Sequence, residues 1–359
     1  MILILSIVWV FIFNTIKDKV RSDLAQPIPV PSATAVPTQK PIKTNTNSKS
    51  EKSLFVPYWA LNNQKIDSPD TDALLYFGIT PGKNGIDKNE AGFKGIDQFL
   101  SSAPKGQGKK LVVRMVDSKI NFEILKDQAK QNAIINDSLK IARDNGFSGV
   151  VLDLEISAVP FDSLIKQVND FTNRFYNESK NRNINFGLMF YGDSFYRIRP
   201  FDIKTLSKNA DEFYVMSYDF SKSRGNPGPN FPLRGKEVYG YDMTRMSEDF
   251  LRYLPPEKTS VVFGLFGYDW IVDDKETAVS TGESKTYSQI QKEFLNDCDY
   301  KDCVIKRKND SAETEITYID DANKKHVIWF EDTQSVSKKE KYLKEKGINN
   351  FSLWAYSYF

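Results

Sequence analysis

The sequence has very few of the residues that support histidine- or cysteine-based chemistry. Among 359 residues there is one histidine, His326, and there are two cysteines, Cys298 and Cys303. A zinc site needs several Cys or His ligands, so a His-based site is almost excluded, and we expect no metal. Nothing around His326 resembles a Ser-His-Asp or Cys-His motif. We expect it to be an ordinary histidine at the start of a strand over residues 326–330.

The sequence also lacks a charge bias and a glycine-rich phosphate loop. The 49 Lys and Arg residues nearly balance the 47 Asp and Glu residues, whereas a nucleic-acid surface normally makes a domain strongly basic. The first apolar run is followed by Pro57, Tyr58 and Trp59 and not by glycines, unlike a dinucleotide-binding fold. We therefore expect no nucleic-acid partner and no cofactor.

The N-terminal segment is apolar but short. Residues 1–16 would span about 24 Å as a helix, less than the roughly 30 Å hydrocarbon core. Either this is the core of a signal peptide, or the true start lies upstream and a longer anchor has lost its first residues. Lys17, Lys19 and Arg21 follow the apolar run, whereas positive charges usually precede an export segment. We favour a retained membrane anchor over residues 1–24 and leave cleavage open.

Residues 25–52 read as a spacer. This stretch consists mostly of Pro, Ser, Thr, Asn and Lys, which cannot bury enough apolar surface to fold. Anchor and spacer together predict an extracytoplasmic, membrane-anchored or secreted domain over 53–359 that faces a cell wall. In such an oxidising setting Cys298 and Cys303 fit a local disulfide, although two free thiols stay open.

Eight short apolar runs follow one another, separated by polar or helical stretches. The runs cover residues 54–59, 73–79, 110–116, 149–154, 184–190, 212–217, 260–266 and 350–356. Between them, 122–144 and 161–180 show helical periodicity, and Gly146 is a natural helix stop. Alternating strands and helices predict parallel pairing, and eight strands close a (β/α)₈ TIM barrel of the α/β class. A doubly wound open sheet is the second choice.

One connection is too long for a single helix. More than eighty residues separate the seventh run from the eighth, with a helical stretch at 286–298 and strand-like stretches at 314–319 and 326–330. We interpret about 271–330 as a small α+β insertion between strands seven and eight. Insertions after barrel strands project from the C-terminal face, so it should form one wall of the active-site cleft.

The fourth run ends in two acids. Strand alternation places Val151, Asp153 and Glu155 on one side, facing the barrel interior, and places Leu152 and Leu154 on the side that faces the helices. Burying a carboxylate pair is costly, and neighbouring acids in such a pocket split their proton affinities. Asp153 and Glu155 are therefore candidates for acid–base chemistry; a surface Asp-x-Glu at a strand exit is the alternative.

This stretch resembles the strand-four signature Asp-x-x-Asp-x-Asp-x-Glu of glycoside hydrolase family 18, the chitinase-like barrels. Residues 214–219 (YVMSYD) resemble the family's Met-x-Tyr-Asp motif, and 351–355 (FSLWA) resemble its last strand. Residues 329–336 and 266–270 are most similar to the branch that acts on spore cortex and peptidoglycan. The resemblance extends from about residue 54 to the C-terminus.

The resemblance implies a substrate-assisted retaining mechanism without an enzyme nucleophile. Glu155 would be the general acid and then the base. Asp153 would orient the substrate's 2-acetamido group, and Tyr218 would hydrogen-bond its carbonyl. Asp219 would touch the same subsite, and Trp354 would stack under the sugar ring. Further substrate-binding walls are expected from other side chains near the strand ends: Tyr58, Tyr191, Met216 and Met189.

Two acids of the signature are missing, because Ser148 and Val151 stand in their places. In the family the second acid shares a proton with the counterpart of Asp153, so we expect an altered acid limb in the pH–rate profile. The predicted function is an exported glycosidase that cleaves β-linked N-acetylglucosamine polymers, peptidoglycan or chitin-like, as a monomer. A non-catalytic, lectin-like barrel is the alternative, and a protein-binding scaffold is a third reading.

Overall fold

The computed structural model describes residues 50–62, 64–68 and 70–359. The predicted anchor, 1–24, and nearly all of the predicted spacer, 25–52, lie outside the described residues. Within the described part of the chain, no helix is both long and apolar enough to cross a bilayer.

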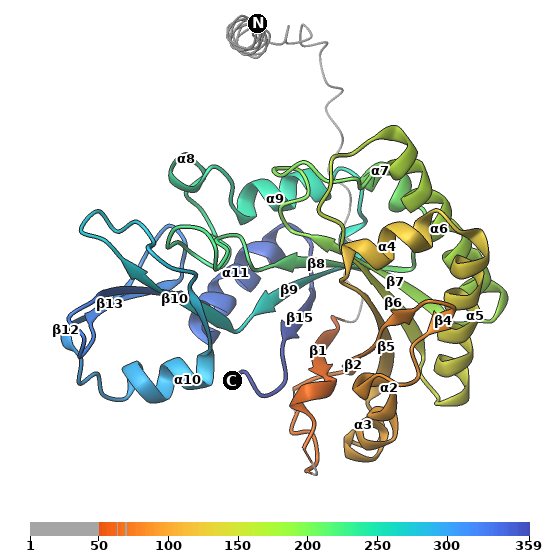
Figure 1. Ribbon diagram of the computed structural model, residues 1–359, viewed down its shortest axis with the longest axis horizontal. Helices are drawn as coiled ribbons and strands as arrows, with labels where there is room; N and C mark the ends of the chain where they lie inside the picture. Colours follow the sequence, from red (N-terminus) through yellow and green to blue (C-terminus); the bar gives the residue numbers. More distant parts are fainter. Residues whose placement is uncertain (1–49, 63, 69) are drawn as a thin grey trace, which may run out of the picture. The chain divides into compact units, whose positions relative to one another are not determined.

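Eight parallel strands close into a barrel (Figure 1). In chain order they are β1 (Lys52–Pro57), β2 (Ala73–Ile79), β5 (Gly108–Met115), β6 (Gly149–Leu154), β7 (Asn185–Tyr191), β8 (Glu212–Ser217), β9 (Thr259–Gly264) and β15 (Asn350–Trp354). β1 closes the ring, since Leu54 is in register with Leu74 on one side and with Leu353 on the other. The predicted TIM barrel is confirmed.

The long connection after β9 forms a separate antiparallel sheet, at the end of the molecule where β12 and β13 are labelled in Figure 1. Its strands are β10 (Phe266–Val272), β11 (Glu283–Thr286), β12 (Lys301–Arg307), β13 (Thr314–Ile319) and β14 (Lys325–Phe330), in the spatial order β11-β10-β14-β13-β12. The predicted insertion between the seventh and eighth barrel strands is confirmed.

Sequence reasoning found β13 and β14 of this sheet but missed the other three strands. β9 ends at Gly264 and β10 begins at Phe266, with only the buried Leu265 between them. In the sequence the end of β9 and the start of β10 therefore form one apolar run, and β10 was missed. β12 was missed because four of its seven residues are Lys, Arg or Asp and most of the strand is exposed. Cys303 lies on β12 and forms a disulfide with Cys298, which decides between the two thiol states left open by the sequence.

Helices lie on the outside of the barrel strands (Figure 1). They are α2 (Ala91–Lys94), α3 (Ile96–Ser102), α4 (Ser118–Leu125), α5 (Gln128–Asp144), α6 (Asp162–Asn181), α7 (Ile203–Leu206), α8 (Lys236–Tyr239), α9 (Met243–Phe250) and α11 (Thr333–Glu345), with α10 (Tyr287–Ile290) in the insertion. Short 3₁₀ turns occupy Tyr58–Ala60 and Pro256–Lys258, a π-helical turn occupies Gln291–Leu295, and a hairpin joins β3 (Pro81–Gly82) to β4 (Gly85–Ile86).

The single helix predicted over 122–144 is two helices. α4 ends at Leu125, and α5 begins at Gln128 because the Asp127 side chain accepts hydrogen bonds from the amides of Ala129 and Lys130. An aspartate in this role caps a new helix and thereby separates it from the preceding one. The predicted stop is correct, since Gly146 takes a positive φ of 70° after α5.

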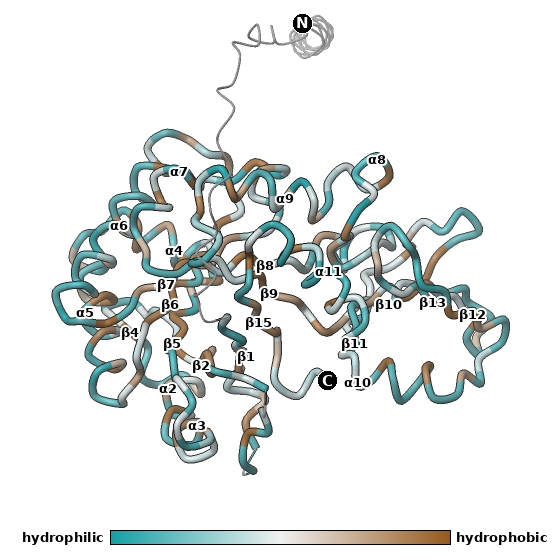
Figure 2. The backbone as a smooth tube through the Cα atoms, turned by 180° about the vertical axis from the view of Figure 1, so that it is seen from behind, coloured by the Kyte–Doolittle hydropathy of each residue, from teal (hydrophilic) through white to brown (hydrophobic). Residues whose placement is uncertain are grey.

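The strands separate two apolar layers of side chains. The barrel strands themselves are largely apolar, as their brown colour in Figure 2 shows. Val150, Leu152 and Leu154 of β6 pack outward in the layer shared with the helices. Val151 packs inward in a second cluster with Met189 and Tyr214. The alternation predicted for this strand is therefore confirmed, and it directs the next inward side chain, Asp153, toward the end of the barrel interior.

A buried ionic cluster ties the insertion to the barrel. The Lys339 ammonium group on α11 lies 2.7 Å from Glu313 and also contacts Glu331, and all three side chains are fully buried. Glu313 also accepts hydrogen bonds from the backbone amides of Asn230 (2.6 Å) and Phe231 (2.8 Å). Burial raises the pKa of Glu331 to about 8, although Lys339 opposes this rise. One lysine therefore compensates two acids in the interior.

Replacing this lysine should destabilise the fold strongly. In Lys339→Met, Glu313 keeps its backbone donors but loses its only neutralising charge among the described residues, so we expect a loss of about 3–5 kcal/mol in the free energy of unfolding. Urea unfolding would measure it. The neighbouring Lys338→Met is the control, because Lys338 is exposed and its loss should cost less than about 0.5 kcal/mol. Equal midpoints for the two variants would contradict the role of the cluster.

Candidate active site

The end of β6 is held in place by backbone and side-chain hydrogen bonds. The amide of Glu155 donates to the carbonyl of Met115 at 2.9 Å, which continues the β5–β6 ladder past the last strand residue. Asn121 of α4 donates from Nδ2 to the carbonyls of Met115 (2.6 Å) and Glu155 (2.9 Å). The buried Asn121 thus fixes the backbone from which the Glu155 side chain projects.

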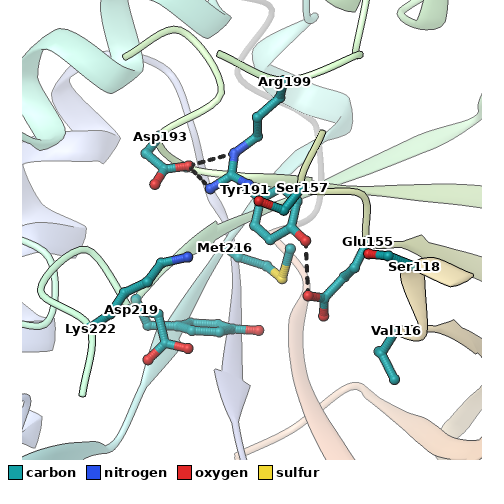
Figure 3. A pocket seen from close by; sticks show the side chains of 12 residues that line it. Val116, Ser118, Glu155, Ser157, Tyr191, Asp193, Arg199, Met216, Asp219 and Lys222 are labelled. Carbon is teal, nitrogen blue, oxygen red and sulfur yellow. Dashed lines mark hydrogen bonds and ion pairs between the residues drawn. The ribbon is translucent and has the colours of Figure 1, made fainter. Parts of the chain in front are cut away.

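Glu155 has one strong hydrogen bond, shown in Figure 3: the Tyr191 hydroxyl donates to its Oε2 at 2.9 Å. Burial raises the pKa of Glu155, and the negative charge of Asp219 adds to this rise. The hydrogen bond from Tyr191 acts in the opposite direction because it stabilises the ionised form. A carboxyl group with a raised pKa can carry a proton nearer neutral pH and release it to a ligand.

Asp153 lies deeper, with 1% of its surface exposed. Its Oδ1 is buried and has no hydrogen-bond partner among the described residues. Burial raises the pKa of Asp153 well above its usual value, the charge of Glu155 raises it further, and Arg114 lowers it. Because the charge of Glu155 raises the pKa of Asp153, ionising both acids at once is unfavourable.

Tyr218 and Asp219 follow β8 and approach these acids from another strand. Burial and the charges of Asp153 and Glu155 raise the pKa of Tyr218, so its phenol stays neutral and can donate a hydrogen bond. Its ring stacks on Trp354, with centroids 6.2 Å apart and planes inclined by 26°. The exposed Trp59 lies edge-on to Trp354 at 6.3 Å, so aromatic surface continues toward solvent.

Asp219 has a left-handed backbone with a φ of 56°, uncommon outside glycine. Its amide donates to Asn230 Oδ1 at 2.8 Å, and Asn230 Nδ2 donates to the carbonyl of Gly264 at 3.0 Å. The Tyr268 hydroxyl of β10 donates to Asp219 Oδ1 at 2.7 Å. This bond lowers the pKa of Asp219 but does not offset the larger rise caused by burial.

The insertion reaches the site through Tyr268. The prediction that the insertion forms a wall of the cleft is wrong for this cavity, because none of the described insertion residues lines it. The insertion instead contacts Asp219, a lining residue, through the Tyr268 hydroxyl.

A cavity of about 290 Å³ opens above these groups (Figure 3). It is lined by side chains and one glycine from the ends of β7 and β8 and from the segments that follow β5, β6, β7 and β8: Val116, Ser118, Glu155, Ser157, Tyr191, Gly192, Asp193, Arg199, Met216, Tyr218, Asp219 and Lys222. The predicted site residues Glu155, Tyr191, Met216, Tyr218 and Asp219 thus lie around one space.

Four predicted site residues do not line this cavity, and one of them, Met189, is buried in the inward apolar cluster. Asp153 lies beneath it, in the barrel interior. Trp354 packs beside it, against Tyr218. Tyr58 lies in a 3₁₀ turn after β1, where its ring contacts the guanidinium of Arg114 at 5.0 Å.

The prediction missed a buried ion pair that supports Tyr191. Arg199 donates from Nε (3.0 Å) and Nη2 (2.7 Å) to Asp193 Oδ1, and its guanidinium lies 3.7 Å from the ring centre of Tyr191. Arg197 also pairs with Asp193. Asp193 comes two residues after the end of β7, a position typical of functional residues in barrels. This position could have identified Asp193 from the sequence. The arginines carried no such signal.

The two positions that depart from the signature have different surroundings. Ser148 precedes β6 at the opposite end from Glu155, and its exposed hydroxyl donates to the carbonyl of Lys109 at 3.1 Å. Val151 is 1% exposed within the inward apolar cluster.

Within the described residues, no group of three His, Cys, Asp or Glu side chains could hold a metal ion. His326 is in β14 and lies 2.8 Å from Asp269.

Residues 56–358 match the sequence model of Glycosyl hydrolases family 18. The chain belongs to this family. The same fold is found in solved structures: the class V chitinase from Nicotiana tobaccum superimposes with a TM-score of 0.74, covering 87% of this chain and 95% of the chitinase at 16% identity.

The curated relatives include two cortical fragment-lytic enzymes. The cortical fragment-lytic enzyme of Bacillus anthracis is 27% identical over 241 residues, which cover 64% of this chain and 51% of the relative. The enzyme of the same name from Bacillus cereus is 26% identical over 312 residues, covering 82% of this chain and 66% of the relative. The chain thus spans between half and two thirds of the length of these relatives. The predicted family, with its spore-cortex branch, is confirmed.

Removing the Tyr191 hydroxyl should raise the pKa of Glu155. Tyr191→Phe deletes the hydrogen bond that stabilises the ionised carboxylate and retains the ring against Arg199, so we expect a rise of about one unit. Carbon-13 NMR titration of the carboxyl groups, assigned with Glu155→Gln, would measure it. Tyr196→Phe is the control, since this exposed ring is not part of the cavity. A lower pKa in Tyr191→Phe would contradict the assigned hydrogen bond.

Proposed function

We propose that this family 18 chain is a glycosidase that cleaves glycans next to a β-linked N-acetylglucosamine residue. The observation that carries the proposal is the arrangement at one cavity of Glu155, whose pKa is raised, with Asp153 beneath it and the neutral phenol of Tyr218 beside it. Two neighbouring acids, one of them protonated, can protonate a leaving group while keeping a negative charge near a developing cation.

The mechanism that fits these groups is substrate-assisted, as the family resemblance implies. Glu155 gives its proton to the glycosidic oxygen as the bond to the anomeric carbon breaks, and the substrate's acetamido oxygen forms a new bond to that carbon. Asp153 orients the acetamido N–H and balances the positive charge of the oxazolinium. Tyr218 donates to the acetamido oxygen. Glu155, now ionised, takes a proton from the water that opens the ring.

The remaining side chains account for binding. Asp219 and Met216 line the cavity and would contact the same sugar, while Trp354 would stack beneath it. Tyr191 would hold Glu155, and Tyr58 and the exposed Trp59 would extend the aromatic surface toward the next sugar. Aromatic rings suit this task because they offer a rigid apolar face at a small cost in conformational entropy.

The substrate we propose is peptidoglycan, with chitin-like oligomers as the second choice. The names of the curated relatives, cortical fragment-lytic enzymes, support the first, and the name of the chitinase supports the second. We also propose that the domain acts outside the cytoplasm, tethered by residues 1–24 through a spacer over 25–52, as a monomer. The Cys298–Cys303 disulfide supports this location, because disulfides persist in oxidising compartments.

Glu155→Gln should abolish turnover and leave saccharide binding nearly unchanged. The amide keeps the shape of the side chain but cannot deliver a proton, so we expect kcat to fall by at least roughly 10³-fold. Release of a fluorophore from N-acetylglucosamine oligomers, and of soluble fragments from purified peptidoglycan, would measure it.

Glu123→Gln is the matched control, because Glu123 is exposed on α4. If the unchanged chain binds saccharide but cleaves neither substrate, the domain is a lectin-like barrel and the hydrolase proposal is wrong.

A further inference from the structure

Arg114 lies directly beside Asp153 on the neighbouring strand. The two residues are in register across the parallel β5–β6 pair, so both side chains point to the inner face of the barrel. The guanidinium is enclosed by aromatic rings, with its carbon 5.0 Å from the centre of Tyr58, 5.7 Å from Trp59 and 5.2 Å from Phe77. These rings restrict the arginine to a narrow range of positions.

Both side chains have polar atoms without partners. Nε and Nη1 of Arg114 are buried and make no hydrogen bond to any described residue, and the same is true of Oδ1 of Asp153. An unpaired buried donor costs about 1–3 kcal/mol, and an isolated buried charge costs more. Two adjacent groups of opposite charge that both lack partners compensate each other's charge across the space between them.

The barrel interior offers Asp153 little other support. Below it lies the inward apolar cluster with Val151, and the described residues place no cation there apart from Lys110, which is already paired with Glu51 and Glu212. The other ionisable groups that act on Asp153 are acids or phenols: Glu155 on its own strand, Tyr191 at the end of β7 and Tyr218 after β8. Arg114 is the positive charge that acts on Asp153.

We propose that Arg114 is a positioning residue that stabilises the ionised form of Asp153 from the neighbouring strand. Arg114 on β5 compensates the charge of Asp153 in this chain. The residue below Asp153 on its own strand, Val151, is apolar and cannot do so. An ionised Asp153 would be ready to stabilise a cationic intermediate.

Arg114→Gln tests this directly, because glutamine removes the charge but keeps a polar side chain. We expect the pKa of Asp153 to rise by about one unit or more, since a neighbouring opposite charge typically shifts a carboxyl by 1–3 units. The full chain would be titrated by carbon-13 NMR of the carboxyl groups, with Asp153→Asn to assign the signal. Arg114→Lys retains the charge and should restore at least half of the shift.

Two further variants separate this role from general effects. Lys119→Met removes an exposed cation on the same segment and should leave the pKa of Asp153 unchanged. If Arg114→Gln does not fold, Arg114→Met, which keeps the apolar stem against the rings, takes its place with the same expected shift. An unchanged Asp153 pKa in either folded neutral variant would overturn the proposal.

Kinetics gives a second readout, and this part rests on the proposed function. The ionised form of Asp153 is required, so activity is lost as pH falls through its pKa. A raised pKa moves the acid limb of kcat/KM to higher pH by the same interval, with KM changed by less than about twofold. A large rise in KM with an unmoved acid limb would instead assign Arg114 to substrate binding and overturn the proposal. If the unchanged chain has no turnover, the proposed function fails, while the NMR titration still decides the role of Arg114.

Discussion

The cost of burying carboxyl groups is the constraint on which the site depends. Asp153 and Glu155 lie on one short stretch of chain in a barrel whose interior is otherwise largely apolar, so each needs a partner that the strand itself cannot provide. The neighbours supply these partners, with Tyr191 from β7 on Glu155 and Arg114 from β5 beside Asp153. Parallel pairing brings such residues together because the ends of neighbouring strands meet at one face.

A second buried ionic cluster links the insertion to the same site. Glu313 from the insertion holds the backbone at Asn230, and Asn230 in turn holds the backbone of Asp219 in its left-handed conformation. Lys339 compensates Glu313 from the last helix, so three distant parts of the chain meet in one cluster. The insertion therefore acts on the cavity through backbone positioning and through Tyr268, although its own residues do not line that cavity.

Patterns with a short period were readable from the sequence. Strand alternation placed Val151 and Asp153 on the inner face correctly, since a period of two leaves only two assignments. The exposed strand β12 was not found, because its charged residues give no apolar alternation, and the break at Asp127 was hidden inside a continuous helical pattern. Arg114 and Arg199 were not recognised either, since an arginine on a strand or loop carries no signal about which acid it will face.

The sequence by itself determined the eight barrel strands, the family and the acids at the end of the fourth barrel strand, because these depend on local periodicity and on short motifs. Only the tertiary structure decided the partners of those acids, and with them the distribution of protons in the site. Tyr191 and Glu155 are 36 residues apart, and Arg114 and Asp153 are 39 apart, yet each pair lies together. Burial and distance set a pKa, and both exist only after the barrel has closed.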